Sequence, residues 1–551
     1  MEILTERITR ERASPGKRRE RDNAAPAPRL YACAVSRAGT GEKRLPDAVA
    51  AARRNCYAEN APARLIPLWK IMHANRQPRA APLAAPLLSF LLLVATGAIP
   101  SALADQDDDA ERVPSSAGEI YSPIQRTFDH QPALPGGPRR PRFRSAPAPD
   151  DEPVLLWNMK QRLQSADPFF RDMKMDVYLR SQALGRDNAG APRSAAWAGG
   201  SAFAVHTGYL DNWLQLEAAA ATSQPLYAPA DEGGTLLLTD NQAEVSSFAV
   251  ANAKMRGFGQ ELVLGRQLIK TPYINPQDNR MLPNTFEGAA LVRQREAAST
   301  FDYGVGYLWA FKARDSSHFV PFSEALGVPE DRGILLAGAK AMPVKGLTVG
   351  AINYYMADVL STTFAEVDWI VDAAPFQLRL SINYTDQRTV GADLLGGGPY
   401  TTGQLSERFA ASYGNATLLF AASHNASAAA LAGPFGSFPA YTVLDQLDFN
   451  EAGQQTLVVG AAYDFSKTIT DGLKLQTRYG WAWGAVDGPT GAPLTRQNEF
   501  NVELEYLPTA GPLKNIHVQI FYSAVELPGN PPGETQQPQV RGIVTYLVPL
   551  L

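Results

Sequence analysis

Thiols are almost absent from this sequence of 551 residues, which contains only two cysteines, Cys33 and Cys56. Both lie near the amino terminus, so the chain after residue 104 contains none. An exported protein of a bacterial envelope gains from lacking thiols, because periplasmic oxidases would otherwise cross-link them. The cysteine usage therefore fits a protein that is exported into an oxidising compartment.

Long apolar stretches are also lacking, with one exception. An apolar run extends from Leu83 to Ile99, preceded by Arg76 and Arg79 and followed by the small residues Ser101–Ala104. A charged region, an apolar region and a small-residue cleavage site in this order are typical of a secretory signal peptide. A buried core helix is the alternative interpretation of the run. Elsewhere nothing approaches the roughly 20 apolar residues of a membrane-spanning helix.

Patterns of catalytic or metal-binding residues are missing as well. His206, His318, His424 and His517 are scattered without metal-ligand spacing, and there is no nucleophile elbow. Ser201 and His206 fall on opposite sides of one alternating segment, so they cannot form the Ser–His pair of an outer-membrane lipase. We therefore predict that the protein is not an enzyme and uses no metal and no cofactor. The net charge of -4, more negative still without the basic first 104 residues, also argues against a nucleic-acid partner.

The composition divides the chain into four parts. We predict a disordered, Arg-rich upstream extension over residues 1–71, a signal peptide over 72–104, a disordered periplasmic lead over 105–166 and a folded domain over 167–551. The extension precedes an export signal, which suggests that the start codon was placed too early. The lead is rich in Pro, Asp and Arg, as disordered linkers are. Within it, Val154 to Leu163 could form one short amphipathic helix.

From residue 167 onward, apolar and polar residues alternate with a period of two. In Glu499 to Tyr506, for example, Phe500, Val502 and Leu504 oppose Asn501, Glu503 and Glu505. Eight short turns and nine long connections, the latter including 184–195, 269–285 and 357–362, predict 18 antiparallel strands. Long strands, short turns and long loops are typical of outer-membrane barrels, which must close because hydrocarbon cannot satisfy an open edge. We therefore predict an all-β transmembrane barrel with an aqueous lumen.

One connection, Gly265 to Gly288, is too elaborate for a simple turn. It contains Pro272, Pro276 and Pro283, together with the charged residues Lys270, Asp278 and Arg280. Prolines at this density exclude a helix. We predict that this loop folds into the barrel and narrows it, with its charges creating a transverse field. Alternatively, Asp278 and Arg280 pair only with each other and hold the loop together.

Several segments resemble the OprD family of outer-membrane porins. GRQ-x3-TP followed by D-x-RMLP-x-TFEG is similar to the family's constriction loop, and MDVYLRSQALGRD resembles its first strand. LKLQTRYGWAWG and EFNVELEYLPTAGPLKNIHVQIFYSA resemble its late strands. The resemblance spans about Asp167 to Leu551. It implies an 18-stranded, substrate-selective channel for small, usually carboxylate-bearing solutes such as amino acids or aromatic acids, with a pore lined by a ladder of basic residues.

We expect that ladder to consist of Arg180, Lys254, Arg256, Arg379, Arg478 and Arg541. A guanidinium offers two hydrogen bonds to a carboxylate that has lost water, and successive cations let the solute move on. Each arginine could instead pair with Asp or Glu and support the wall. The family's type members have arginines where this sequence has Gln519 and Phe521, so their selectivity for basic amino acids is not carried over.

The sequence thus predicts a passive porin in a Gram-negative outer membrane. Its expected partners are small solutes and outer-membrane lipid, and it would be a monomer or a trimer. The alternative is a non-conducting barrel with a structural or adhesive role, which would carry no ion current after reconstitution.

Overall fold

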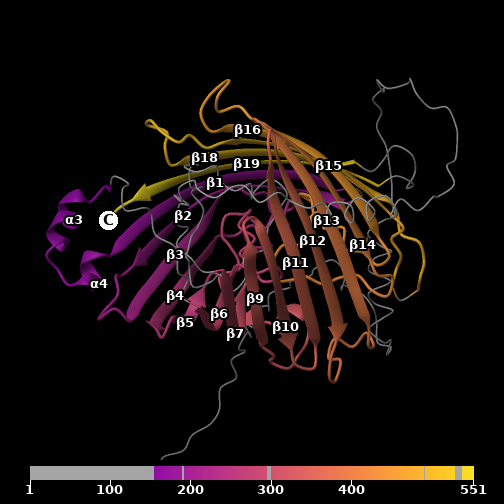
Figure 1. Cartoon of the computed structure of the whole chain (residues 1–551), viewed down its shortest axis with the longest axis horizontal. Coiled ribbons are helices and arrows are strands. Elements are labelled where there is room, and N and C mark those ends of the chain that lie inside the picture. The colour runs from indigo at the N-terminus through magenta and orange to yellow at the C-terminus, as the bar shows by residue number, and fades with distance from the viewer. Residues whose placement is uncertain (1–153, 189–190, 294–299, 489, 528–535) are drawn as a thin grey trace, which may run out of the picture.

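The computed structural model describes residues 154–188, 191–293, 300–488, 490–527 and 536–551. Their regular secondary structure is almost entirely one antiparallel sheet that closes on itself (Figure 1). The predicted upstream extension, the predicted signal peptide and most of the predicted lead lie outside the described residues. In the described ranges, no helix is both long enough and apolar enough to cross a membrane.

The sheet contains 19 strands in the described residues, and the barrel closes where β1 pairs with both β2 and β19. Strand β8 has only two residues, and β7 pairs directly with β9. The other 18 strands therefore form the wall, as the sequence predicts. The strands are β1 (Lys174–Asn188), β2 (Ala191–His206), β3 (Leu214–Tyr227), β4 (Val245–Gly257), β5 (Gln260–Gln267), β6 (Thr285–Arg293), β7 (Phe301–Lys312), β8 (Val320–Pro321), β9 (Ile334–Val344), β10 (Leu347–Met356), β11 (Leu360–Ala373), β12 (Phe376–Thr389), β13 (Thr401–Tyr413), β14 (Ala416–Asn425), β15 (Gln455–Asp464), β16 (Leu473–Trp483), β17 (Gln497–Tyr506), β18 (Ile516–Glu526) and β19 (Gln536–Pro549).

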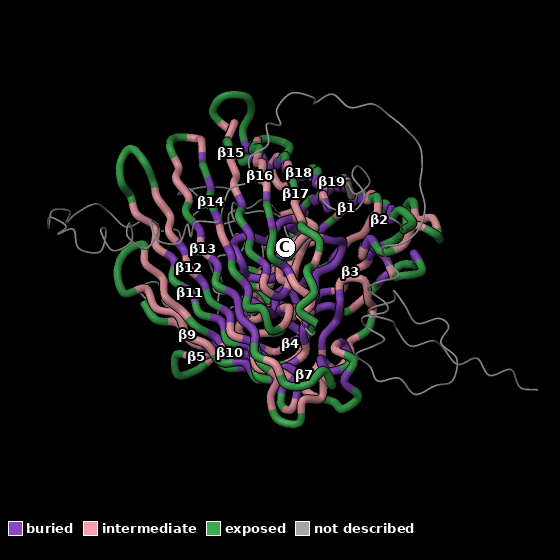
Figure 2. Tube along the Cα trace, turned by 90° about the vertical axis from the view of Figure 1, so that its right-hand side faces the viewer, coloured by how far each residue is buried: buried purple, intermediate pink, exposed green. Residues whose placement is uncertain are grey.

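Buried and exposed positions alternate along the strands of the wall (Figure 2). In many strands the buried side chains are polar and the exposed ones apolar, the reverse of a soluble sandwich. In β17, Glu499, Asn501 and Glu503 are buried, whereas Phe500 and Leu504 are exposed. Because the exposed set is apolar, the outer surface suits lipid, and the polar set lines the lumen. The alternation of the sequence thus becomes the two faces of the barrel.

Short turns join the strands at one end. At the turn between β9 and β10, Gly346 has a φ of +78°, and a Cβ there would lie 2.2 Å from the Ile370 carbonyl oxygen. Only glycine adopts this conformation and leaves this space at no cost. The turn chemistry therefore fixes where β10 begins.

The prediction was wrong for two of the long connections. Strand β1 extends to Asn188 and β2 begins at Ala191, so most of 184–195 is strand. Strand β11 begins at Leu360, which leaves only three residues after β10. The Gly, Pro and Asp residues near 185–192 are typical of loops, but backbone pairing with the neighbouring strand overrides that local preference.

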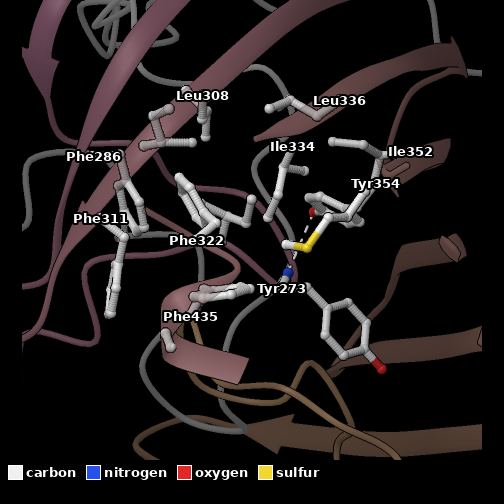
Figure 3. Close-up of a cluster of buried hydrophobic side chains, with 14 of the residues drawn as sticks. Tyr273, Phe286, Leu308, Phe311, Phe322, Ile334, Leu336, Ile352, Tyr354 and Phe435 are labelled. Atoms are coloured by element: carbon white, nitrogen blue, oxygen red, sulfur yellow. Dashed lines mark hydrogen bonds between the residues drawn. The ribbon is translucent and has the colours of Figure 1, made fainter. Parts of the chain in front are cut away.

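Inward loops fill much of the barrel with three apolar clusters. In the largest cluster, Phe286 and Phe311 on the wall meet Phe322 from the loop after β7 and Phe435 from the loop after β14 (Figure 3). The ring centroids of Phe322 and Phe435 are 4.8 Å apart. Such packing stabilises the loops inside the lumen, since each buried aromatic removes a large apolar area from water.

In the described residues, two short helices precede the barrel: α3 (Trp157–Leu163) and α4 (Pro168–Arg171). Asp167 caps α4 by accepting a 2.9 Å hydrogen bond from the Phe169 backbone N–H. Both helices lie beside the carboxyl terminus, at the end of the barrel that carries the short turns (Figure 1).

Candidate functional site

The first inward loop, residues 268–284, crosses the lumen between opposite walls. On one side, the Tyr273 backbone N–H donates to Tyr354 Oη at 3.2 Å, and Tyr273 Oη donates to Thr385 Oγ1 at 2.9 Å. On the other side, Arg180 Nη1 of β1 donates to Asp278 Oδ1 at 2.6 Å. The loop is thus fixed to β10 and β12 at one end and to β1 at the other. The predicted inward-folded constriction loop is confirmed.

A second inward loop, residues 426–454, meets the first at Asn275. The Asn275 backbone N–H donates to the Phe435 carbonyl at 3.3 Å, and Asn275 Nδ2 donates to the Ser437 carbonyl at 3.1 Å. The Ser437 backbone N–H returns a bond to Asn275 Oδ1 at 3.1 Å. Sequence reasoning did not predict that this loop folds inward. Its run of apolar residues, AYTVL among them, is a signal that could have identified it as buried.

Glu499 of β17 holds the far end of the second inward loop. Its carboxylate accepts the backbone N–H groups of Asp445 and Gln446, both at 2.9 Å, and that of Leu447 at 2.7 Å. The Glu499 side chain is completely buried. Sequence reasoning gave Glu499 no role in holding a loop, whereas three convergent hydrogen bonds make it the anchor of this loop.

Asp445 then presents its own carboxylate to the arginine of β19. Asp445 Oδ1 accepts a 2.7 Å hydrogen bond from Arg541 Nη2, and Oδ2 accepts one from Ser523 Oγ at 3.2 Å. The Arg541 guanidinium lies 4.0 Å above the Phe521 ring. Phe521 is one of the two positions where arginines were expected from the resemblance, and here the adjacent strand supplies the guanidinium that covers it.

Three arginines from separate parts of the chain group around Arg280. Arg280 interacts electrostatically with Arg541, Arg314 and Arg186, and also with Asp445. Burial is the main cause that lowers the pKa of the Arg280 guanidinium, and the neighbouring arginines lower it further while Asp445 opposes them. The guanidinium nevertheless stays protonated near neutral pH. The group around Arg280 therefore contains more arginines than carboxylates.

Two of these arginines are held by neutral oxygen atoms. Arg186 Nε donates to Asn188 Oδ1 at 2.9 Å, and Arg280 Nε donates to the Thr235 carbonyl at 3.0 Å. Such partners position a guanidinium without cancelling its charge. Arg186 was missed by sequence reasoning, because it falls in the segment predicted to be loop. Strand parity, which places it on the same face as Arg180 and Gln182, would have found it.

Of the two expectations for the charges of the first inward loop, the transverse field stays a prediction, and the exclusive Asp278–Arg280 pair can be checked against the hydrogen bonds. Asp278 pairs with Arg180, while the Arg280 side chain donates to the carbonyls of Thr235 and Asn279. The exclusive Asp278–Arg280 pair therefore does not form. Lys270 is partly buried in the same loop.

The remaining expected ladder residues lie outside this cluster or are held by other groups. Arg379 Nε forms a 2.9 Å ion pair with Asp368, which also pairs with Arg408 at 3.3 Å. Arg408, also missed, lies 4.4 Å from the Tyr441 ring of the second inward loop. Arg478 is a half-buried residue of β16 opposite Asn501.

Two further basic residues lie near the short turn after β2. Lys254 forms a buried ion pair with Glu217, which is also 3.0 Å from His206 Nδ1. Arg256 lies 3.6 Å above the Tyr209 ring. In the part of the chain that the structure describes, no group of three or more His, Cys, Asp or Glu residues could hold a metal ion.

Comparison with known proteins agrees with this architecture. Residues 167–550 match the family model described as outer membrane porin, OprD family. OpdK of Pseudomonas aeruginosa, solved with vanillate, has a TM-score of 0.61 and 21% identity over 69% of this chain and 99% of its own. OccK9 (OpdG) of the same species has a TM-score of 0.64 and 22% identity over 70% of this chain and 100% of its own. A BenF-like porin from Pseudomonas fluorescens has a TM-score of 0.63 and 18% identity over 69% of this chain and 100% of its own. No curated protein matches the chain.

Proposed function

This chain belongs to the OprD family of outer membrane porins, and we propose that it lets small carboxylate-bearing solutes diffuse down their gradient. Amino acids, aromatic acids and other organic acids are the candidates. The protein is a channel of the outer membrane. Both inward loops belong to the chain that forms the barrel, so one barrel suffices for selection, whether the protein is a monomer or a trimer.

The observation that carries the proposal is the group of arginines around Arg280. Arg186 and Arg280 are fixed by neutral oxygens, and Asp445 accepts from Arg541. The net positive charge attracts an anion, and the loops exclude much of the water that would screen it. A carboxylate that sheds water there meets guanidinium groups, which bind it in a bidentate manner.

Movement beyond this point requires weaker sites along the wall. The candidates are Arg180, Arg379, Arg478, Lys254 and Arg256. Three of them, Arg180, Arg379 and Lys254, each form an ion pair with a carboxylate of the protein. A carboxylate partner in the wall weakens the attraction of an arginine for the solute, so the solute is released again. Conduction needs such moderate binding at successive sites. OpdK was solved with vanillate, and we extend solutes of that kind to this chain as part of the proposal.

Liposome swelling with benzoate and with the uncharged benzamide tests the proposal, because the two solutes have nearly the same size. We expect benzoate to enter faster through the wild-type channel. Arg186→Gln should reduce benzoate entry toward the benzamide rate and leave benzamide unchanged. The matched control is Arg388→Gln, since Arg388 is exposed at the far end of β12 and pairs with Asp386.

Planar-bilayer recording separates this function from that of a non-conducting barrel. We expect single-channel steps and a reversal potential in a KCl gradient that indicates preference for chloride. Absence of single-channel steps from folded protein would overturn the channel function for this chain. Equal benzoate and benzamide rates in a conducting protein would overturn only the preference for carboxylates.

A further inference from the structure

Helix α3 presents an apolar face that the barrel does not cover. On a helix with about 3.6 residues per turn, Leu156, Met159 and Leu163 share one face, and Asn158 and Gln161 lie on the other. Met159 is 42% exposed, and no residue of α3 is buried. Leu155 just before the helix is 70% exposed. An apolar face of this kind needs a partner other than water.

The helix is fixed to the end of the barrel by the backbone. The Leu155 N–H donates to the Pro549 carbonyl at 2.9 Å, and the Leu156 N–H donates to the Leu550 carbonyl at 2.8 Å. These bonds place α3 directly after β19, beside the beginning of β1 (Figure 1). On those two strands, Leu179, Val544 and Tyr546 are exposed apolar residues of the outer wall. Helix α3 thus begins where the lipid-facing band of β19 and β1 ends.

Neighbouring segments extend the same apolar zone. The Gly208 N–H donates to the Phe169 carbonyl at 2.9 Å, which joins α4 to the short turn after β2. Around this junction Phe170, Leu210 and Trp213 are all exposed. Tryptophan and other aromatic side chains are enriched where a membrane protein crosses from hydrocarbon to headgroups. The zone therefore lies at the level of the lipid headgroups on the short-turn side.

The charges of α3 match an anionic lipid surface. Its basic residues are Lys160 and Arg162, in its last turn, and its seven residues WNMKQRL contain no acid. A basic helix with an apolar face lies in the plane of the interface and is held by apolar burial together with attraction to anionic headgroups. At seven residues, α3 is far too short to span the bilayer.

We propose that α3 is an interfacial anchor that inserts Leu156, Met159 and Leu163 into the periplasmic leaflet of the outer membrane, with Lys160 and Arg162 on anionic phospholipid headgroups. The family match begins at residue 167, so this anchor is a feature of the chain outside the matched region. Because Leu155 and Leu156, just before α3, are hydrogen-bonded to Pro549 and Leu550, lipid binding also stabilises the seam where the barrel closes.

Site-specific fluorescence in vesicles tests the anchor. In full-length protein with Cys33→Ser and Cys56→Ser, Met159→Cys and Gln161→Cys are labelled with the environment-sensitive dye NBD and refolded into vesicles of phosphatidylcholine and phosphatidylglycerol. We expect the dye at 159 to lie about 5–10 Å below the headgroup surface, where brominated lipid quenches it and aqueous iodide does not. The dye at 161 should show the opposite pattern.

Lipid composition and charge provide the control. Lys160→Ser with Arg162→Ser should restore iodide quenching at 159 in vesicles that contain phosphatidylglycerol. In pure phosphatidylcholine the wild-type and variant proteins should differ little. Equal iodide access at 159 and 161 would overturn the proposal, because the helix would then lie in water. Channel conductance is recorded on the same samples, so a failure of the anchor is distinguished from a failure of the channel.

Discussion

Replacing Glu499 by glutamine should release the second inward loop without removing any residue that faces the solute path. In the wild-type protein, Glu499 Oε1 accepts the N–H groups of Asp445 and Gln446, and Oε2 accepts that of Leu447 at 2.7 Å. Glutamine keeps one oxygen and replaces the other with an NH2 group. One buried donor then faces another donor, and the charge that strengthened the remaining bonds is gone.

The magnitude follows from the cost of an unmade buried hydrogen bond. Leaving one buried N–H without an acceptor costs about 1–3 kcal/mol. Taking about 2 kcal/mol, and about 1.4 kcal/mol for each tenfold change in an equilibrium constant, the displaced loop becomes roughly 30 times more populated. Since Asp445 belongs to this loop, its contact with Arg541 is broken in the displaced state.

Single-channel recording measures this change directly. We expect Glu499→Gln to add current fluctuations between two levels and to reduce the difference between benzoate and benzamide entry. Glu505→Gln is the matched control, because Glu505 is a buried carboxylate on the same strand and face that bonds His517 of β18. Steady wild-type current in Glu499→Gln, or the same new fluctuations in both variants, would refute the anchoring role.

Two further predictions concern the first inward loop and the turns. Asp278→Asn removes the carboxylate 2.6 Å from Arg180 Nη1, so reversal potentials should shift toward stronger anion selectivity. A shift toward cations would contradict the assigned charge balance. Gly346→Ala should destabilise the β9–β10 turn by more than about 1 kcal/mol, because its φ is +78° and Ile370 leaves no room. Urea unfolding in detergent would measure this, with Gly542→Ala as the control, where a Cβ meets nothing within 4 Å.

The fold followed from the sequence because each strand carries its own evidence. In β17 the alternation of Glu499 to Glu505 with Phe500 to Leu504 determines which side chains face the lumen, and the structure buries that polar set. This signal is local, so a single sequence reveals it. The turns were found for the same reason, since residues such as Gly346 mark them.

The site followed only in part, because it depends on contacts between distant residues. The role of the first inward loop was predicted from its prolines and the resemblance. The bonds from Asn275 to Phe435 and Ser437 and from Glu499 to Asp445 connect segments far apart in the chain. No periodic pattern encodes such contacts. Sequence reasoning therefore recognised neither the inward fold of the second loop nor the role of Glu499 in holding it.

The inward loops and the wall are held by different kinds of interaction, which has a consequence for melting. A continuous ladder of backbone hydrogen bonds runs around the wall from β1 to β19 and back to β1. The two loops rest mainly on side-chain contacts such as the ring packing of Phe322 with Phe435. Local opening therefore costs less free energy in the loops than in the wall. On warming, the inward loops should open before the ring of strands comes apart. The barrel would then be a wide pore that no longer discriminates among solutes.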